Sequence, residues 1–213
     1  MLADWAESLA NQCDTLGKKR TFTTPYGKTC TVSGGDNIGW KIDQEALQAT
    51  VAEQAPLGKI QTLAVPCSSK TNGYAGPGQR DWSARYIDVD LSQQMARMYD
   101  DSGNLIWSSA IVSGKPGHNT PTGVYTIKGK KSPTTLIGDI DPATGQPEYE
   151  SEVQYWMPFK GNSVGLHDAS WQPTFGGNWW VEHGSHGCVN LPTGAAASLY
   201  GLCVSGDIVV VHN

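Results

Sequence analysis

The chain has no excess of positive charge, no long apolar run and no closely paired cysteines. Lys and Arg number 15 against 20 Asp and Glu, giving a formal net charge of −5, which excludes the basic surface expected of a nucleic-acid-binding or anionic-membrane-binding protein. No apolar run reaches the roughly 18 residues of a membrane span, and the first residues, MLADWAESLA, lack the basic and apolar regions of a signal peptide. We therefore expect any export signal or anchor to lie upstream of this chain.

Five cysteines are present, and none forms a C-x-x-C pair. The odd number leaves at least one thiol outside any intramolecular bridge, so four could form two bridges in an oxidising compartment or none in a reducing one. Cys13 and Cys30 both fall on apolar faces of expected elements, which makes a bridge between them a hypothesis. A bridge between Cys67 and Cys203 is a less favoured alternative.

The composition indicates a turn-rich, β-leaning globular protein, with 25 Gly, 12 Pro and only 16% charged residues. Residues 1–79 predict a small α+β domain. Its expected elements are a helix over 4–16, a hairpin in TFTTPYGKTCTVSGG, a helix over 44–54 capped by Asp43, and a strand from Ile60 to Val65. The Gly- and Ser-rich stretch SSKTNGYAGPGQRDW, residues 68–82, predicts a linker with a boundary near residue 80.

Residues 80–213 predict a mainly β domain. The segments YIDVDL, QQMARMY and LIWSSAIV form an expected β-meander, followed by strands at 123–128, 163–167 and 207–211 and one helix at 192–200. Residues 131–158 show little periodicity and hold several prolines, which is typical of a functional loop and makes them a candidate lid.

The stretch GSHGCVN, residues 184–190, places Cys188 two residues after His186. A cysteine nucleophile needs a base and donors for the oxyanion, and glycines beside the thiol let a substrate approach the backbone. His167, His183, His186 and Cys188 could together bind zinc, but their spacing is not that of a usual zinc site. The other possible roles of Cys188 are one half of a disulfide and a buried core side chain.

His167 is the best candidate base because it ends an expected strand, SVGLH, and projects into a loop. A catalytic histidine must be held in one tautomer by a carboxylate or a carbonyl on its other ring nitrogen. His118 and His212 are expected to be solvated surface residues.

The pattern of His167, 17 residues, and then SHGCVN resembles the signature of the L,D-transpeptidases, which cross-link bacterial peptidoglycan through a cysteine acyl-enzyme. Residues 84–213, with their SGK and TPTG segments, look like the catalytic domain of this family. Residues 1–79, especially GKTCTVSGGDNIGWKID, are similar to a small domain that often precedes it and is a candidate peptidoglycan-binding domain.

The resemblance implies a β-sandwich with one short helix, in which Cys188 attacks the bond between the third and fourth residues of a donor tetrapeptide stem and D-alanine leaves. It implies that His167 is the base, oriented by the backbone carbonyl of Asp168, and that His186 shapes the thiol turn. Backbone N–H groups of Gly187 and Cys188 would face the oxyanion. Hydrogen bonds from Ser185 and Asn190 would hold the turn. The expected substrate-covering residues are Tyr149, Tyr155, Trp156, Met157 and Trp171.

The implied partners are donor and acceptor peptidoglycan stems, with carbapenems as inhibitors of the same cysteine and no metal, cofactor or nucleic acid. The implied location is extracellular, in the cell wall or on the outer face of a bacterial membrane. If water replaces the acceptor amine, the enzyme is an L,D-carboxypeptidase, and the sequence does not decide between the two. A noncatalytic wall-binding protein, a sortase-like transpeptidase and a Cys/His peptidase are the remaining alternatives.

Overall fold

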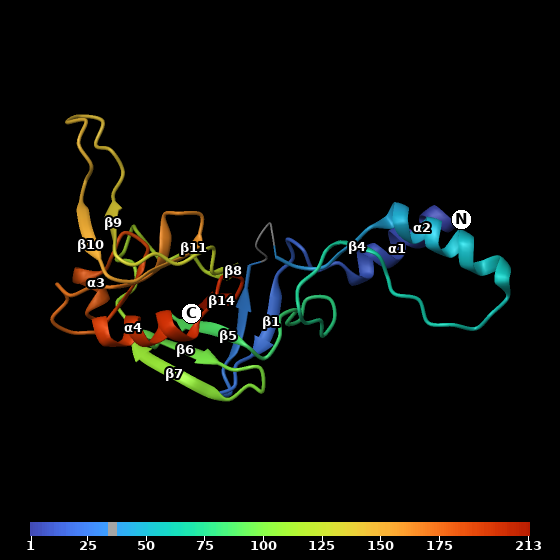
Figure 1. The fold of residues 1–213 in the computed structure, drawn as a ribbon, viewed down its shortest axis with the longest axis horizontal. Helices are drawn as coiled ribbons and strands as arrows, with labels where there is room; N and C mark the ends of the chain where they lie inside the picture. The colour runs from blue at the N-terminus through green and yellow to red at the C-terminus, as the bar shows by residue number, and fades with distance from the viewer. Residues whose placement is uncertain (34–37) are drawn as a thin grey trace. The chain divides into compact units, whose positions relative to one another are not determined.

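The computed structural model describes residues 1–33 and 38–213, which form two compact units, Met1–Ser83 and Ala84–Asn213 (Figure 1). Residues 34–37 lie outside the described residues, and they include the last two glycines of the expected hairpin stretch and part of the segment that is similar to a wall-binding domain. Within the described part of the chain, no helix combines the length and apolar character needed to cross a membrane.

The described residues of the N-terminal unit, 1–33 and 38–83, form two helices, a 3-10 turn and two small antiparallel sheets. Its elements are α1 (Leu2–Cys13), β1 (Arg20–Thr23), β2 (Thr29–Val32), β3 (Lys41–Ile42), α2 (Gln44–Gln54), η1 (Ala55–Leu57) and β4 (Cys67–Ser69). The β1–β2 hairpin and the helix capped by Asp43 confirm the sequence predictions, since the Asp43 carboxylate accepts a hydrogen bond from the backbone N–H of Ala46 at 3.0 Å.

Helix α1 ends at Cys13, earlier than predicted. Asp14 adopts an extended conformation, with φ −63° and ψ 135°, and its carboxylate accepts a hydrogen bond from the backbone N–H of Ile42 at 2.8 Å. That long-range bond fixes the chain reversal before Gly17. Between the helices, a small core forms from Ala6, Ala10, Ile42 and Leu47.

Two predictions for this unit are wrong. Residues 60–65 form no strand, because their side chains find no sheet or core to cover them, and the strand of this region is β4, which pairs with β3. Residues 68–82 are not a free linker. Asp81 is fully buried in an ion pair with Arg20 at 2.8 Å, and the ring of Trp82 packs edge-on against Phe22 at 5.0 Å.

Cys13 and Cys67 both pack against the small core of α1 and α2, and both are free cysteines. The hypothesis of a Cys13–Cys30 bridge is therefore wrong: Cys30 lies on β2, within the other sheet of this unit. The Cys67–Cys203 bridge is also not formed.

The C-terminal unit is mostly strand. Its elements are β5 (Tyr86–Asp90), β6 (Met95–Tyr99), β7 (Leu105–Ala110), β8 (Gly123–Thr126), β9 (Thr134–Ile137), β10 (Glu150–Val153), β11 (Trp156–Lys160), β12 (Val164–Asp168), α3 (Trp180–His183), β13 (Val189–Leu191), α4 (Thr193–Leu202) and β14 (Ile208–His212). They form a five-stranded sheet ordered β7-β6-β5-β14-β8, a three-stranded sheet ordered β11-β12-β13, and the hairpin β9–β10.

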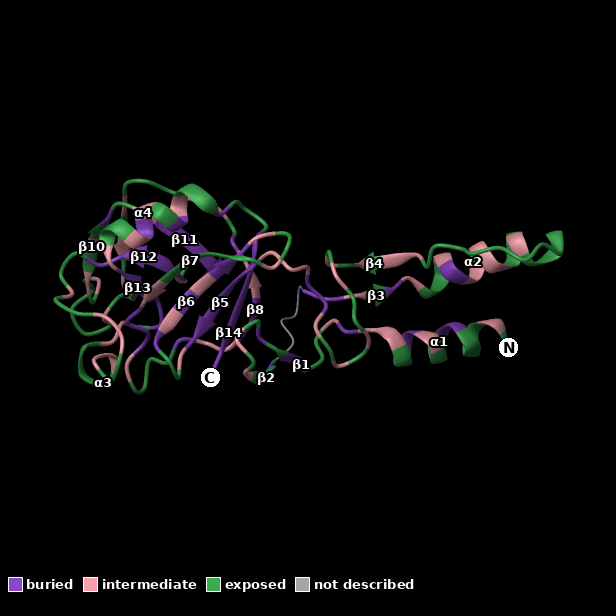
Figure 2. Cartoon of the chain, turned by 90° about the horizontal axis from the view of Figure 1, so that it is seen from below, coloured by how far each residue is buried: buried purple, intermediate pink, exposed green. Residues whose placement is uncertain are grey.

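The main core lies between these two sheets and beneath α4, where the strands of Figure 2 are coloured as buried. The predicted meander is confirmed by the antiparallel pairs β5–β6 and β6–β7. Strand β14 then inserts parallel to β5, which a reading of local patterns does not reveal. The core residues come from both sheets and from α4, and include Ile87, Met98, Phe159, Leu166, Val189 and Leu199.

Residues 131–158 are not the loop without strands that was predicted. They contain the antiparallel hairpin β9–β10, which stands out from the rest of this unit in Figure 1, and we call residues 131–156 the lid hairpin. The base of the lid hairpin is closed by paired backbone hydrogen bonds between Lys131 and Trp156, at 3.0 and 2.9 Å. The short helix α3 was not predicted, and α4 continues through Gly201 instead of ending there.

Candidate functional site

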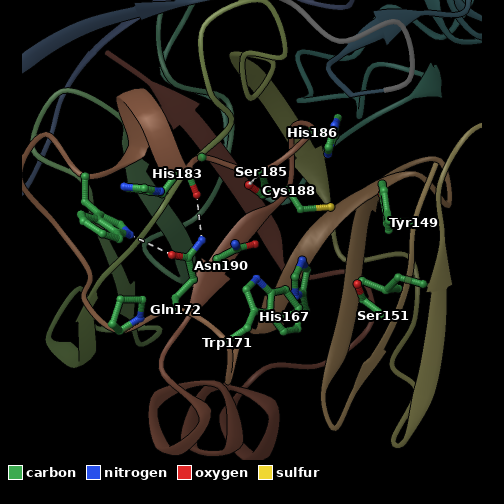
Figure 3. Close-up of a pocket in the computed structure, with 14 residues that line it drawn as sticks. Tyr149, Ser151, His167, Trp171, Gln172, His183, Ser185, His186, Cys188 and Asn190 are labelled. Atoms are coloured by element: carbon green, nitrogen blue, oxygen red, sulfur yellow. Dashed lines mark hydrogen bonds between the residues drawn. The ribbon is translucent and has the colours of Figure 1, made fainter.

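The three-stranded sheet brings the predicted base and the thiol motif together. Strand β12 is central, antiparallel to β11 and parallel to β13, so that Trp156, His167 and Asn190 lie in one row across the sheet. A cavity of about 400 Å³ opens in front of this row (Figure 3). Its lining residues are Leu136, Tyr149, Ser151, His167, Trp171, Gln172, Pro173, Trp179, His183, Gly184, Ser185, His186, Cys188 and Asn190.

Cys188 immediately precedes β13, is 7% exposed and lines this cavity. Its thiol donates a hydrogen bond to the backbone carbonyl of Ser163 at 3.5 Å. Burial raises the pKa of the Cys188 thiol to about 11, because the thiolate is poorly solvated there. The thiol is thus protonated at neutral pH, and a base must remove its proton before the sulfur can attack.

His167 faces the same cavity and is 4% exposed. Its Nδ1 lies 2.8 Å from the backbone carbonyl of Asp168, and because a carbonyl only accepts, Nδ1 carries the proton and Nε2 has a free lone pair. Burial lowers the pKa of His167, an effect that the bond to Asp168 partly opposes. The imidazole is therefore neutral near pH 7, in the tautomer that a proton acceptor requires.

Ser185 fixes the turn that precedes the thiol. Its hydroxyl donates to the backbone carbonyl of Cys188 at 2.6 Å and accepts from the backbone N–H of Gly187 at 3.0 Å. Gly187 has φ +122°, a conformation that favours glycine. The Gly187 N–H, which is expected to face the oxyanion, is bonded to Ser185 in this structure. The other donor of the expected pair is the N–H of Cys188.

Asn190 is held by its backbone, which exchanges two hydrogen bonds with Val112 at 2.9 and 3.0 Å. Its side-chain oxygen does not hold the thiol turn as expected. Although buried, Oδ1 of Asn190 has no hydrogen-bond partner among the described residues, and the side chain lines the cavity. A buried acceptor without a partner is costly, so a group in the cavity that donates a hydrogen bond to Oδ1 would be stabilised by it.

His186 lies between the lid hairpin and the loop that contains His118. Its ring stacks on Tyr149 with centroids 5.3 Å apart and contacts the ring of His118 edge-on at 4.6 Å. Burial, followed by the electrostatic effect of the neighbouring Lys115 and His118 side chains, lowers the pKa of His186. The contact with His118 was missed: that residue is exposed, as predicted, but is also part of the site.

A second cavity, of about 490 Å³, reaches Cys188 from the other side of the lid hairpin and shares Leu136, Tyr149, His186 and Cys188 with the first. Trp156 lines this second cavity and Trp171, which is 50% exposed, lines the first. Tyr155 and Met157 line neither and pack toward the main core, so their expected place in a substrate-covering lid is wrong. Side chains alternate along a strand, so the neighbours of Trp156 point to the opposite face.

One wall of the first cavity comes from residues 169–184, which sequence reasoning largely missed. The Gln172 side chain donates to the carbonyl of His183 and accepts from the Trp179 indole N–H, both at 2.8 Å, and the rings of Trp179 and His183 stack with centroids 3.7 Å apart (Figure 3). The dense aromatic content of WQPTFGGNWW was the available signal. The described residues contain no group of three or more His, Cys, Asp or Glu side chains arranged to bind a metal.

Comparison with known proteins gives a family match for the C-terminal unit. Residues 84–211 match the model of the YkuD L,D-transpeptidase catalytic domain. The curated relative "Probable L,D-transpeptidase 3" of Mycobacterium tuberculosis is 30% identical over 104 residues. That match covers 46% of this chain and 36% of the relative, so the chain corresponds to about a third of the relative's length.

Solved structures resemble both the whole chain and its C-terminal part. The structure of a cysteine-to-serine mutant of the Enterococcus faecium L,D-transpeptidase is 31% identical, with a TM-score of 0.83, over 99% of this chain and 80% of that one. The E. faecium catalytic domain acylated by ertapenem is 43% identical, with a TM-score of 0.53, over 61% of this chain and 97% of that one. The first likeness extends beyond the catalytic domain.

Proposed function

The chain belongs to the family of L,D-transpeptidase catalytic domains, and from this premise we propose that it forms 3→3 peptidoglycan cross-links through a Cys188 acyl-enzyme. The observation that carries the proposal is the pairing, in one cavity, of a buried protonated thiol with a neutral histidine whose Nδ1 is held by a backbone carbonyl. Such a pair becomes reactive when the substrate arrives, by transfer of the thiol proton to Nε2 of the histidine.

In the proposed acylation, His167 Nε2 accepts the proton of Cys188 as the sulfur attacks the carbonyl of the third residue of a donor tetrapeptide stem. The negative charge that develops on the carbonyl oxygen is stabilised by backbone N–H donors of the turn, of which Cys188 is the candidate. The bond to D-alanine then breaks, and the protonated His167 gives its proton to the departing amine. A thioester at Cys188 remains.

In the proposed second half, the side-chain amine of an acceptor stem attacks the thioester. His167 accepts the proton of the amine and returns it to the sulfur, and a new amide joins the third residues of two stems. The meeting of two cavities at Cys188 supports the proposal that donor and acceptor approach the same sulfur separately. Attack by water in place of the amine would release a tripeptide stem.

We further propose that the protein works outside the bacterial cytoplasm, where peptidoglycan is found, and that residues 1–79 bind the wall. The whole-chain likeness to the E. faecium enzyme supports a role for both units in one protein. The relative acylated by ertapenem supports the proposal that carbapenems acylate Cys188 here.

Incubation with disaccharide-tetrapeptide, with products read by mass, tests the function. We expect a cross-linked dimer and free D-alanine from the wild type and neither from Cys188→Ala. Tripeptide without dimer would favour the carboxypeptidase reaction. An equally active Cys188→Ala variant would contradict the thioester mechanism, and absence of any product or covalent adduct in the wild type would favour a noncatalytic wall-binding protein.

A further inference from the structure

Asp168 takes part in two hydrogen-bonding arrangements that meet at the same residue. Its backbone carbonyl holds Nδ1 of His167, and one oxygen of its side chain accepts hydrogen bonds from the backbone N–H groups of Gln154 and Tyr155, each at 2.8 Å. The Asp168 side chain is 3% exposed. Carboxylate bonds to backbone donors are among the stronger protein hydrogen bonds, and here they are sheltered from water.

Residues 154 and 155 are the two that join β10 of the lid hairpin to β11 of the catalytic sheet. Their N–H groups point at the Asp168 carboxylate, while the next N–H, of Trp156, is bonded to the carbonyl of Lys131 at 2.9 Å. The carboxylate therefore satisfies the donors at the base of the lid hairpin that the strands do not pair. Leaving two such donors without partners would be unfavourable.

The base of the lid hairpin packs against Cys188, the proposed nucleophile. Val153, Trp156 and Cys188 form one buried cluster, with Leu136 of β9 packed against it. Tyr149, the residue immediately before β10, lines both cavities. A change in the position of residues 153–156 would therefore move the walls of the space that a substrate must occupy.

We propose that the Asp168 side chain is a positioning residue that anchors the lid hairpin to the strand carrying the base. This inference rests on the proposed function and deepens it. The backbone carbonyl orients His167, and the carboxylate fixes the cover of the cavity relative to that histidine. The expectation that the Asp168 side chain need not matter is thereby replaced by a specific role.

Asp168→Ala keeps the carbonyl that orients His167 and removes only the carboxylate. With disaccharide-tetrapeptide as donor, we expect kcat/KM to fall by about 10- to 100-fold, mainly through KM, because displacement of a cavity wall by about 1 Å has effects of that size. Hydrogen exchange at the amides of 154 and 155 should accelerate. Alkylation of Cys188 by iodoacetamide, which is small enough to react without the lid hairpin in place, should not fall below the wild-type rate.

Asp168→Asn separates hydrogen-bond acceptance from charge, since its amide oxygen can accept both N–H groups, and we expect it to restore most of the donor kcat/KM. Asp100→Ala is the matched control: Asp100 accepts hydrogen bonds from the N–H groups of Ser102 and Asn104, at 2.9 and 2.8 Å, in the turn between β6 and β7, away from both cavities. It should behave as the wild type does in donor turnover.

The proposal is overturned if Asp168→Ala matches Asp100→Ala in donor turnover, if Asp168→Asn is as impaired as Asp168→Ala, or if alkylation falls in parallel with turnover. Should Asp168→Ala not fold, Gln154→Pro removes one of the two donors without altering Asp168, and a wild-type KM in that variant would equally overturn the proposal. If the wild type forms no acyl-enzyme, the proposed function fails, while the exchange rates at 154 and 155 still decide whether the anchor exists.

Discussion

Cys188 and Cys203 of the C-terminal unit have the same protonation state at neutral pH but different surroundings. Burial raises the pKa of both Cys188 and Cys203 to about 11, so neither is a thiolate at neutral pH. Cys203 is fully buried beside the sulfur of Met157, at 3.4 Å, in the main core. Cys188 lines a cavity together with His167. Access and a positioned base, not the acidity of the free thiol, distinguish the candidate nucleophile from the core cysteine.

The largest change expected in this comparison comes from removing the base. His167→Ala should lower acylation of Cys188 by a carbapenem at pH 7 by about 100- to 10,000-fold, because the thiol would then have to ionise by itself. The residual rate should rise about tenfold per pH unit toward the thiol pKa of about 11. Adduct mass against time, measured across pH, checks both expectations.

A residual rate in His167→Ala that does not change between pH 7 and 10 would contradict the assignment of His167 as the base. Cys203 is the internal control, since it should remain unmodified in the native protein with either histidine or alanine at position 167.

The rate of acylation at acidic pH tests the role of the His167 imidazole. His167 must be neutral to accept the thiol proton, and its pKa is lowered from the ordinary value of 6.5. A lowered pKa keeps the ring neutral as the pH falls, so acylation by the wild type should still be near its maximum at pH 6.5. Activity should decline only at lower pH, as His167 becomes protonated. A half-maximal rate at or above pH 6.5 would contradict the buried, neutral histidine.

A smaller effect is expected from the turn that presents Cys188. Ser185→Ala loses both bonds of the hydroxyl, to the Cys188 carbonyl and from the Gly187 N–H, and we expect the acylation rate to fall by about tenfold. Ser185→Thr keeps the hydroxyl and should recover much of the rate. Stopped-flow acylation with a carbapenem compares the three proteins, and equal impairment of both variants would argue against the role of the hydroxyl.

The smallest change in activity is expected at the core cysteine. Cys203→Ala should lower the free energy of unfolding by about 1 kcal/mol, because it leaves a small void next to Met157, and should leave turnover within about twofold. Denaturant unfolding and turnover measured on the same sample check this. Loss of turnover without loss of stability would mean that Cys203 has a role beyond packing.

The sequence predicts those parts of the fold whose cause is local. The cap of α2 and the meander β5–β7 depend on neighbouring residues, and both are confirmed. The lid hairpin was missed because its strands are short and largely exposed, so that residues such as Thr135 and Glu152 carry no apolar alternation. The insertion of β14 beside β5 and the burial of His212 against Asp88 depend on partners more than 100 residues away in sequence, and local patterns do not register them.

The candidate site also has features that the sequence predicts and features that it does not predict. Cys188, His167 and the carbonyl of Asp168 could be proposed from a motif and its spacing, and the structure brings them together. Other contacts depend on the directions of individual hydrogen bonds. These are the bond from the Gly187 N–H to Ser185 and the bonds that the Asp168 carboxylate accepts at the base of the lid hairpin. Composition and periodicity carry no information about such directions.

Trp156, His167 and Asn190 form one row across the sheet, so an insertion has different effects within β12 and in the segment that follows it. A single residue inserted within β12 would reverse the faces of the strand, placing an aliphatic side chain in the cavity and the imidazole in the core. The 17 residues between His167 and Ser185 are different, because they leave the end of β12 and return at Ser185, which forms a bridge with Gly114. A change in the length of this segment would reshape the cavity wall while the register between β12 and β13 is kept.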